Sequence, residues 1–411
     1  MARLQVNSYR EIFANRSFLL FWSGFTLSSI GDSLTRVALT WFVFEQTKSP
    51  QALGMLTIAY TAPILIGGFV AGPLLDRFPP RRVMIIDNLI RGAAFAALPI
   101  LHALSLLEIW HVYVFAAIYG SLMMISLAGG PTLIPSIVRE DQLETANALE
   151  TLSFTLSNVI GPPLAGLLIV WIGTTNVVVI DALSYFVFAF LLLGVSARKT
   201  SQFVSEEQDS SFRLLSAVRL MIENRVLLST TLMFMAFNVG LGALTVFLPL
   251  VSDRLAPGSS EMFGALLGAL ALGEVISAGL AGSLQLKMGL GMRIVLAQIL
   301  SGLSLALLFM ESNFWAVAGG LFLLGFFSAP LTIWAQTLRM QIIPTEMRGR
   351  TFALLRTLMQ GATPLGGALA GFLLPVMGIQ MIVALSSIVI GAPGLAGMRT
   401  AELRQAGREV S

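Results

Sequence analysis

The chain alternates between long apolar runs and short polar breaks. Each run is roughly 20 or more residues long, the length that a helix needs to cross the hydrocarbon core of a bilayer. In chain order the runs cover residues 17–44, 51–75, 83–104, 109–138, 144–172 and 175–197, and then 226–252, 261–286, 292–311, 314–342, 347–376 and 379–398. The pattern predicts an all-α integral membrane protein with twelve transmembrane helices.

The longest polar break divides these runs into two sets of six. Residues 198–225 contain Glu206-Glu207-Gln208-Asp209, and a short amphipathic helix is expected near Phe212 to Ile222. We expect three parts: an N-terminal six-helix bundle over 1–197, a cytoplasmic linker over 198–225, and a C-terminal six-helix bundle with a cytoplasmic tail over 226–411. The polar residues 1–16 do not resemble a cleavable signal peptide.

Basic residues predict the orientation in the membrane. Of the 25 Lys and Arg, only Lys48 and Arg254 fall in loops on one side, and four lie deep within predicted spans: Arg36, Arg91, Arg339 and Arg356. The other 19 of the 25 lie in the tails, the linker and the opposite loops, or within the first four residues of a span beside such a loop. Cytoplasmic loops carry an excess of Lys and Arg. We therefore expect both termini in the cytoplasm of a cell whose inner (plasma) membrane the chain crosses many times.

Composition supports this class and excludes several chemistries. The chain is 56% hydrophobic and 11% charged, with a mean hydropathy of +0.83, unlike a soluble globular protein. It has no cysteine and two histidines, which excludes disulfides and a cysteine nucleophile and leaves little for a metal site. No P-loop pattern is present, so we expect no process driven by ATP hydrolysis. We expect no enzyme activity, no cofactor, no metal and no nucleic-acid partner.

The two halves repeat each other. Ala14-Asn15-Arg16 opens the first span as Glu223-Asn224-Arg225 opens the seventh. Gly161-Pro-Pro-Leu-Ala-Gly166 in the fifth span corresponds to Gly366-Gly-Ala-Leu-Ala-Gly371 in the eleventh, and Gly72 corresponds to Gly282. Parallel repeats of this kind place a transport site between two bundles that rock against each other.

One short loop carries four charges and two prolines between the second and third spans. It reads Gly72-Pro-Leu-Leu-Asp76-Arg77-Phe-Pro-Pro-Arg81-Arg82. The loop resembles the signature loop of the major facilitator superfamily, from which it departs at Pro79 and Pro80. The resemblance implies the major facilitator fold and a conformational latch made by Gly72, Asp76, Arg77, Arg81, Arg82, Asp87 and Arg91. In the alternative, the arginines only anchor the chain on the cytoplasmic side.

The fifth span contains a compact glycine and proline pattern. Gly161, Pro162 and Gly166 resemble the antiporter motif of exporters, with Ala165 where a glycine is usual. The resemblance favours export over uptake. Small residues that let two membrane helices pack closely are the plainer interpretation.

Three stretches of the first half resemble a narrower branch of the superfamily, the macrolide efflux pumps and siderophore exporters. They are Gly31-Asp32 through Gly54, Asp76-Arg77 through Arg91, and Asp181-Ala-Leu-Ser-Tyr185. This branch consists of drug:proton antiporters. The resemblance supports the superfamily more strongly than it supports any one substrate.

Charges within the spans are candidates for mechanism, because a charge at bilayer depth is costly. Asp32 and Arg36 lie one helical turn apart, as do Asp87 and Arg91, so each pair could neutralise itself. Glu274 has no basic residue within a turn. We expect proton coupling at Asp32, Arg36 and Glu274. For Arg339 and Arg356 we expect side chains that reach the cytoplasmic surface, and for Asp181 we expect solvation at the outer end of its helix.

A substrate cavity is expected between the first, fourth, seventh and tenth helices if the family architecture holds. Its polar and aromatic candidates are Ser28, Tyr119, Met124, Asn238, Thr245, Trp334 and Gln336. With 27 Phe and 18 Met, the chain is suited to an adaptable pocket for an amphiphilic molecule.

The sequence thus predicts a monomeric, proton-coupled exporter of small amphiphilic molecules in a lipid bilayer. Two alternatives remain open: a lysophospholipid or siderophore exporter of the same fold, and a membrane sensor that binds without transport.

The topology can be tested directly because the chain has no cysteine. Single cysteines at Ser49 and Ser259 should react with an impermeant thiol reagent in intact cells, since residues 45–51 and 252–260 are expected to face outward. Cysteines at Ser205 and Ser210 should react only after the cells are opened. Labelling of the linker in intact cells would reverse the orientation.

Overall fold

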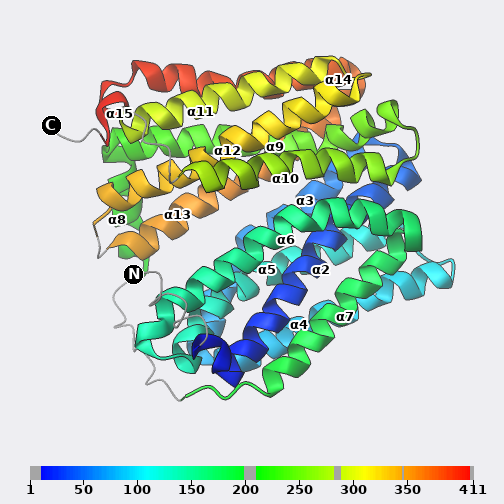
Figure 1. Cartoon of the computed structure of the whole chain (residues 1–411), viewed down its shortest axis with the longest axis vertical. Helices are drawn as coiled ribbons and strands as arrows, with labels where there is room; N and C mark the ends of the chain where they lie inside the picture. Colours follow the sequence, from blue (N-terminus) through cyan, green and yellow to red (C-terminus); the bar gives the residue numbers. More distant parts are fainter. Residues whose placement is uncertain (1–10, 199–209, 282–287, 345–346, 408–411) are drawn as a thin grey trace. The chain divides into compact units, whose positions relative to one another are not determined.

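The structure is a computed structural model that describes residues 11–198, 210–281, 288–344 and 347–407. Within these ranges, the side chains at positions 65–66, 68–70, 72, 76, 210–214, 281, 348–350 and 353 are also outside the description. The described chain is almost entirely helical and contains no strand (Figure 1). An all-α fold is therefore confirmed.

The first half forms six long helices over the six predicted spans. They are α2 (Arg16–Thr47), α3 (Pro50–Arg77), α4 (Pro80–Ala103), α5 (Ile109–Ile137), α6 (Leu143–Ile172) and α7 (Thr174–Leu193), with a short 3-10 turn, η1 (Glu140–Gln142), before α6. Pro80 is the first residue of α4. The first N–H groups of a helix have no helical partner, so a proline, which lacks an N–H, costs no helical hydrogen bond there. Gly173 separates α6 from α7 with φ 82, a conformation that favours glycine.

The second half begins with a short helix over the segment expected to be amphipathic. Its elements are α8 (Ser210–Glu223), α9 (Arg225–Leu255), α10 (Ser260–Ala281), α11 (Leu290–Ser304), η2 (Leu305–Phe309), α12 (Phe314–Ile342), α13 (Arg348–Gly361), α14 (Thr363–Arg399) and α15 (Ala401–Gln405).

Two breaks modify the predicted spans at the end of the chain. Gly378, with φ 77 and ψ 165, divides α14 into two helices near the expected boundary between 376 and 379. The expected span 347–376 is itself divided at Ala362, between α13 and α14. Pro364 explains this second break, because it has no N–H to donate to the carbonyl of Gln360.

Nine stretches among the described residues are long and apolar enough to cross a membrane, and the last, Leu354–Arg399, is 46 residues long. Helices α2 and α3 are not among these nine stretches; α2 carries the charged residues Asp32 and Arg36. The full count of twelve spans stays a prediction.

The chain divides into two compact units. Unit 1 contains Met1–Val43 and Ala59–Phe203, and unit 2 contains Phe44–Ile58 and Val204–Ser411. The tip of the α2–α3 hairpin thus belongs to unit 2, and the three expected parts of the chain stay a prediction. There, Lys48 Nζ lies 2.8 Å from Asp253 Oδ1, and a Cβ on Gly54 would lie only 2.9 Å from the carbonyl of Gly367.

Within unit 1, α4 lies against both α7 and α5 (Figure 1). Helices α3 and α5 approach backbone to backbone, because a Cβ on Gly67 would overlap the carbonyl of Ser121 and a Cβ on Gly120 would overlap that of Tyr60. Close approach through small residues is how membrane helices gain packing energy without a hydrophobic drive between them. This approach lets the rings of Tyr60 and Tyr119 stack at 4.7 Å.

Unit 2 is organised around the contact of α9 with α14. A Cβ on Gly366 would overlap the carbonyl of Val239, and a Cβ on Gly242 would lie 2.9 Å from the N of Gly367. The small residues that the repeat places in the eleventh span therefore serve helix packing here.

Replacing Gly366 by Leu should destabilise unit 2, because the new side chain meets backbone that cannot move aside. We expect a loss of about 1–3 kcal/mol or more, measured as a lower midpoint of thermal unfolding in detergent. Gly319→Leu is the matched control, since nothing lies within 4 Å of a Cβ at that position of α12. Equal stability of the two variants would contradict the close contact of α9 with α14.

Candidate functional site: a buried charge cluster in unit 1

Arg91, in the middle of α4, is the residue around which the buried polar groups of unit 1 gather. Its side chain is 1% exposed. Its Nε lies 3.3 Å from Asp87 Oδ1, one turn earlier on α4, and its Nη1 lies 4.0 Å from Asp32 Oδ1 on α2. A guanidinium at this depth requires anionic partners. One arginine therefore forms ion pairs with two carboxylates on two helices.

Aromatic rings surround the same guanidinium. It lies 5.1 Å from the ring centroid of Tyr119 on α5 and 5.7 Å from that of Tyr185 on α7. Both distances allow cation–π attraction. The Tyr185 hydroxyl donates a hydrogen bond to Asp32 Oδ1, and the Ser126 hydroxyl donates to Asp87 Oδ2 at 3.1 Å. The cluster thus joins α2, α4, α5 and α7.

Asp32 differs from its neighbours in exposure. Its side chain is 25% exposed, whereas that of Asp87 is fully buried. The sequence suggested that Asp32 pairs with Arg36 one turn away. Instead, Arg36 Nη2 donates to Asn158 Oδ1 on α6 at 2.7 Å. Asp32 is left to Arg91 and Tyr185, which are distant in the chain and close in the fold.

Asp181 adds a third carboxyl to the cluster. It is 0% exposed, so the expected solvation at the outer end of its helix is wrong. The burial of Asp181 follows from the close approach of α2 at Gly31. A Cβ on Gly31 would overlap Asp181 Oδ1, so α2 lies directly over this side chain. The Ser184 hydroxyl lies 3.2 Å from Oδ1, while Oδ2 has no hydrogen-bond partner within the described part of the chain.

The residues of the expected latch have different surroundings. Asp87 and Arg91 belong to the buried cluster. Arg81 donates from Nε and Nη2 to the carbonyls of Leu192 and Leu193, at 2.7 and 2.6 Å, and so ties the start of α4 to the end of α7. Arg77 and Arg82 are exposed. The side chains of Gly72 and Asp76 lie outside the described residues, and the latch stays a prediction.

The exporter-like motif lies close to the cluster. Gly161 and Pro162 of α6 are buried, and so is Gly166. A Cβ on Gly161 would lie 2.5 Å from Ser33 Cβ. The motif therefore packs α6 against the residue that follows Asp32.

The expected cavity residues of unit 1 are mostly packed. Ser28 is buried, and Tyr119 belongs to the Arg91 cluster. Met124 packs in a small core with Ala71, Leu75 and Ile125.

The expected cavity residues of unit 2 have varied surroundings. The Asn238 amide donates to the carbonyl of Phe234 at 3.0 Å, and the Thr245 hydroxyl donates to that of Gly242 at 2.7 Å. Gln336 is exposed. The Trp334 ring lies 5.9 Å from the Arg293 guanidinium and lines an apolar cavity of about 220 Å³ among α10, α11 and α12. A cavity shared by all seven residues stays a prediction.

Glu274, Arg339 and Glu150 are further charged residues within helices, and Arg356, which also lies within a helix, is exposed. Glu274 is partly buried on α10, where its carbonyl accepts from the Ser277 hydroxyl at 3.2 Å. Arg339 is only 5% exposed; it donates to the carbonyl of Thr230 at 3.1 Å and lies over the ring of Phe234, so it does not reach the surface as expected. Glu150 of α6, partly buried beside Gly130, was missed, although an acid within an apolar span was a usable signal.

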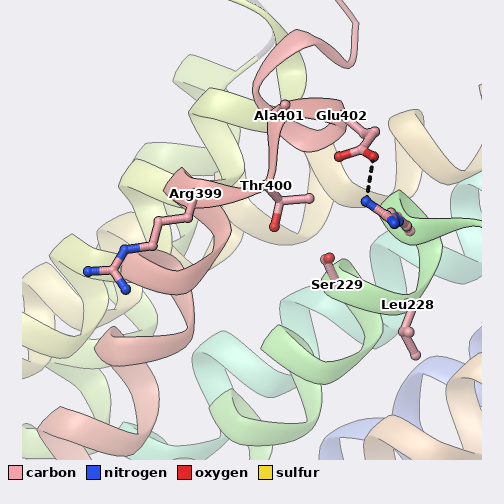
Figure 2. A pocket seen from close by; sticks show the side chains of 7 residues that line it. Leu228, Ser229, Arg399, Thr400, Ala401 and Glu402 are labelled. Atoms are coloured by element: carbon pink, nitrogen blue, oxygen red, sulfur yellow. Dashed lines mark hydrogen bonds and ion pairs between the residues drawn. The ribbon is translucent and has the colours of Figure 1, made fainter.

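An open pocket of about 450 Å³ lies at the ends of α9 and α14 in unit 2 (Figure 2). Arg225 Nη1 and Glu402 Oε1 form an ion pair across one side at 3.0 Å, and Arg399 points away from Thr400 and Ser229. The pocket holds no residue of the Arg91 cluster. We therefore assign it no part in the candidate site.

Arg91→Gln should destabilise unit 1, because it leaves two carboxylates buried without their cation. We expect a loss of about 3–5 kcal/mol, followed by thermal unfolding in detergent. Adding Asp87→Asn should recover most of that loss, since it removes the more buried charge. Arg82→Gln, the same change at an exposed position, is the control. If Arg91→Gln is as stable as the control, the cluster is not held by this charge.

Comparison with known proteins identifies the family. A family model described as transmembrane secretion effector matches residues 10–409. The staphyloferrin A transporter of Staphylococcus aureus is 24% identical over 394 residues, which cover 92% of this chain and 94% of that protein. Macrolide efflux protein A of Streptococcus pyogenes is 24% identical over 387 residues, covering 91% and 93%. Multidrug efflux pump Tap of Mycolicibacterium fortuitum is 24% identical over 390 residues, covering 91% and 93%.

Solved structures agree on the fold. A mutant of the nucleoside transporter NupG superposes with a TM-score of 0.74 at 12% identity, over 93% of this chain and 99% of that one. A bacterial homologue of the iron transporter ferroportin, in its inward-facing state, gives 0.71 at 18% identity, over 93% and 98%. At these identities the likeness concerns the fold alone. Because the family model covers nearly the whole sequence, the chain belongs to the transmembrane secretion effector family of major facilitator superfamily transporters.

Proposed function

We propose that this protein exports small amphiphilic molecules by proton-coupled antiport with alternating access, as a monomer in the inner membrane with both termini in the cytoplasm. The observation that carries the proposal is the position of Asp32. Its side chain is 25% exposed and contacts an arginine that is 1% exposed. We infer that the exposed part of the carboxyl exchanges protons with water, while the rest of it faces a buried cation.

The contacts suggest how a proton changes the cluster. An ionised Asp32 attracts Arg91 and accepts from Tyr185. A protonated Asp32 loses the charge attraction, and Arg91 then pairs with Asp87 alone, 3.3 Å away. Protonation therefore changes the forces between α2 and α4 while the buried pair stays neutral. A change of force between helices is what a rocking transporter needs.

Two observations support export. Gly161 of the exporter-like motif packs against Ser33, directly beside Asp32. Two relatives are named as efflux proteins, one for macrolides and one for several drugs. A siderophore is a second candidate substrate, because a further relative is named a staphyloferrin A transporter.

A proton gradient supplies enough energy for such export. One charge that crosses about 150 mV releases roughly 3.5 kcal/mol. That energy sustains a concentration ratio of about 300-fold for a neutral substrate.

Asp32→Asn should abolish uphill efflux that is sensitive to a protonophore, because the side chain keeps its shape and loses its titratable proton. Substrate binding and downhill exchange should persist. The measurement is accumulation of a panel of dyes and antibiotics in cells and in proteoliposomes with an imposed pH gradient. Glu274→Gln should give a partial version of the same loss.

Glu45→Gln, an exposed position on the same helix, is the matched control and should transport normally. If Asp32→Asn still concentrates substrate against its gradient, with an unchanged pH dependence, Asp32 is only a structural partner of Arg91.

A further inference from the structure

Asp181 is the one carboxyl of the cluster for which the described chain supplies no cation within ion-pair distance. Arg91 forms ion pairs with Asp87 and Asp32, and Arg36 donates to Asn158. Asp181 has instead the Ser184 hydroxyl at 3.2 Å and complete burial under α2. A buried carboxylate without a paired cation is costly, and it commonly becomes neutral by binding a proton.

We propose that Asp181 is a second proton-binding site, a neutral carboxylic acid for as long as Asp32 is ionised. The two carboxyls interact electrostatically, and the negative charge of one disfavours that of the other. The role in transport rests on the proposed function, but the protonation of Asp181 does not.

Charge balance supports this assignment. The charged groups that face Asp181 and its neighbours are Asp32 and Arg36 on α2 and Asp87 and Arg91 on α4; the titratable hydroxyls are Tyr60 on α3, Tyr119 on α5 and Tyr185 on α7. With Asp181 neutral, two carboxylates face two guanidinium groups, and the cluster has no net charge. With Asp181 ionised, the cluster would carry one uncompensated negative charge in the membrane interior.

Thr35 lies one turn after Gly31, the residue at which α2 covers Asp181, and its hydroxyl interacts with this carboxyl. A threonine hydroxyl can donate to a carboxylate or accept from a carboxylic acid, so this contact is compatible with a neutral Asp181.

The pairing links the two sites. When Asp32 binds a proton, its charge no longer opposes ionisation of Asp181. Asp181 then releases its proton more readily. The pair therefore holds one or two protons and is never fully ionised, so the membrane interior carries no net negative charge during exchange.

Infrared spectroscopy of the purified protein in detergent tests this directly, because a protonated carboxyl has its own carbonyl band that shifts in heavy water. Carbon-13 labelling of aspartate separates the Asp bands from those of Glu150 and Glu274. At neutral pH we expect a labelled protonated-carboxyl band in the wild type that is absent from Asp181→Asn and retained in Asp87→Asn. A wild type without this band, or a band that Asp181→Asn retains, overturns the proposal.

The linkage gives a second readout that needs only the native Asp181. In Asp32→Asn, the neighbouring negative charge is gone, so the Asp181 band should disappear at a lower pH, at a proton concentration about tenfold or more higher than in the wild type. An unchanged titration would show that the two carboxyls do not share their charge. The two proposals fail separately: transport without proton coupling leaves the band in place, and a missing band leaves the loss of coupling in Asp32→Asn unaffected.

Discussion

The ion pairs of Arg91 are the interaction on which the rest of unit 1 depends. A guanidinium that is 1% exposed in a membrane domain is tolerable only if carboxylates come to it, and two do, one from its own helix and one from α2. The rings of Tyr119 and Tyr185 close the remaining sides from α5 and α7. One charge thus contacts side chains from four helices. A lysine would not replace it, since only the planar guanidinium can reach both carboxylates and stack on rings.

Small residues make this arrangement possible. In a bilayer, apolar side chains gain nothing by leaving lipid for protein, so helices associate through close packing and buried polar contacts. Gly31 lets α2 cover Asp181, Gly161 lets α6 reach Ser33, and Gly120 brings α5 against Tyr60 of α3. Each of these glycines lies where a helix must approach the charge cluster. Where this packing is close, as at Gly31 over Asp181, it excludes water that would weaken electrostatic interactions.

Sequence alone predicted the class, the family and the six long helices of the first half, because hydropathy and the Asp76-Arg77 loop depend on local residue order. It did not predict the partners of the buried charges. Asp32 and Arg36 have the spacing of a helical pair, yet Asp32 pairs with Arg91 and Arg36 donates to Asn158. Side-chain pairing depends on which helices become neighbours. Asp181 was expected to be solvated at the outer end of its helix for the same reason: the sequence does not show that α2 covers this side chain. Nor did the sequence predict that the carbonyls at the end of α7 accept hydrogen bonds from Arg81, whose part in the latch stays a prediction.

The three carboxyls of the cluster differ in exposure, so they differ in how accessible they are to protons. Asp87 and Asp181 are closed off, whereas Asp32 is 25% exposed. In the proposed mechanism, protons therefore enter and leave at Asp32, and the buried partners set how readily it holds them. Arg91 favours the charged form of Asp32, and Asp181 opposes that form only if it is itself charged. A cluster with one accessible and two enclosed carboxyls can thus change its charge by one at a time. In a rocking transporter, such single steps allow α2 to be released from α4 without ever leaving the arginine unpaired, because Asp87 remains on the same helix one turn away.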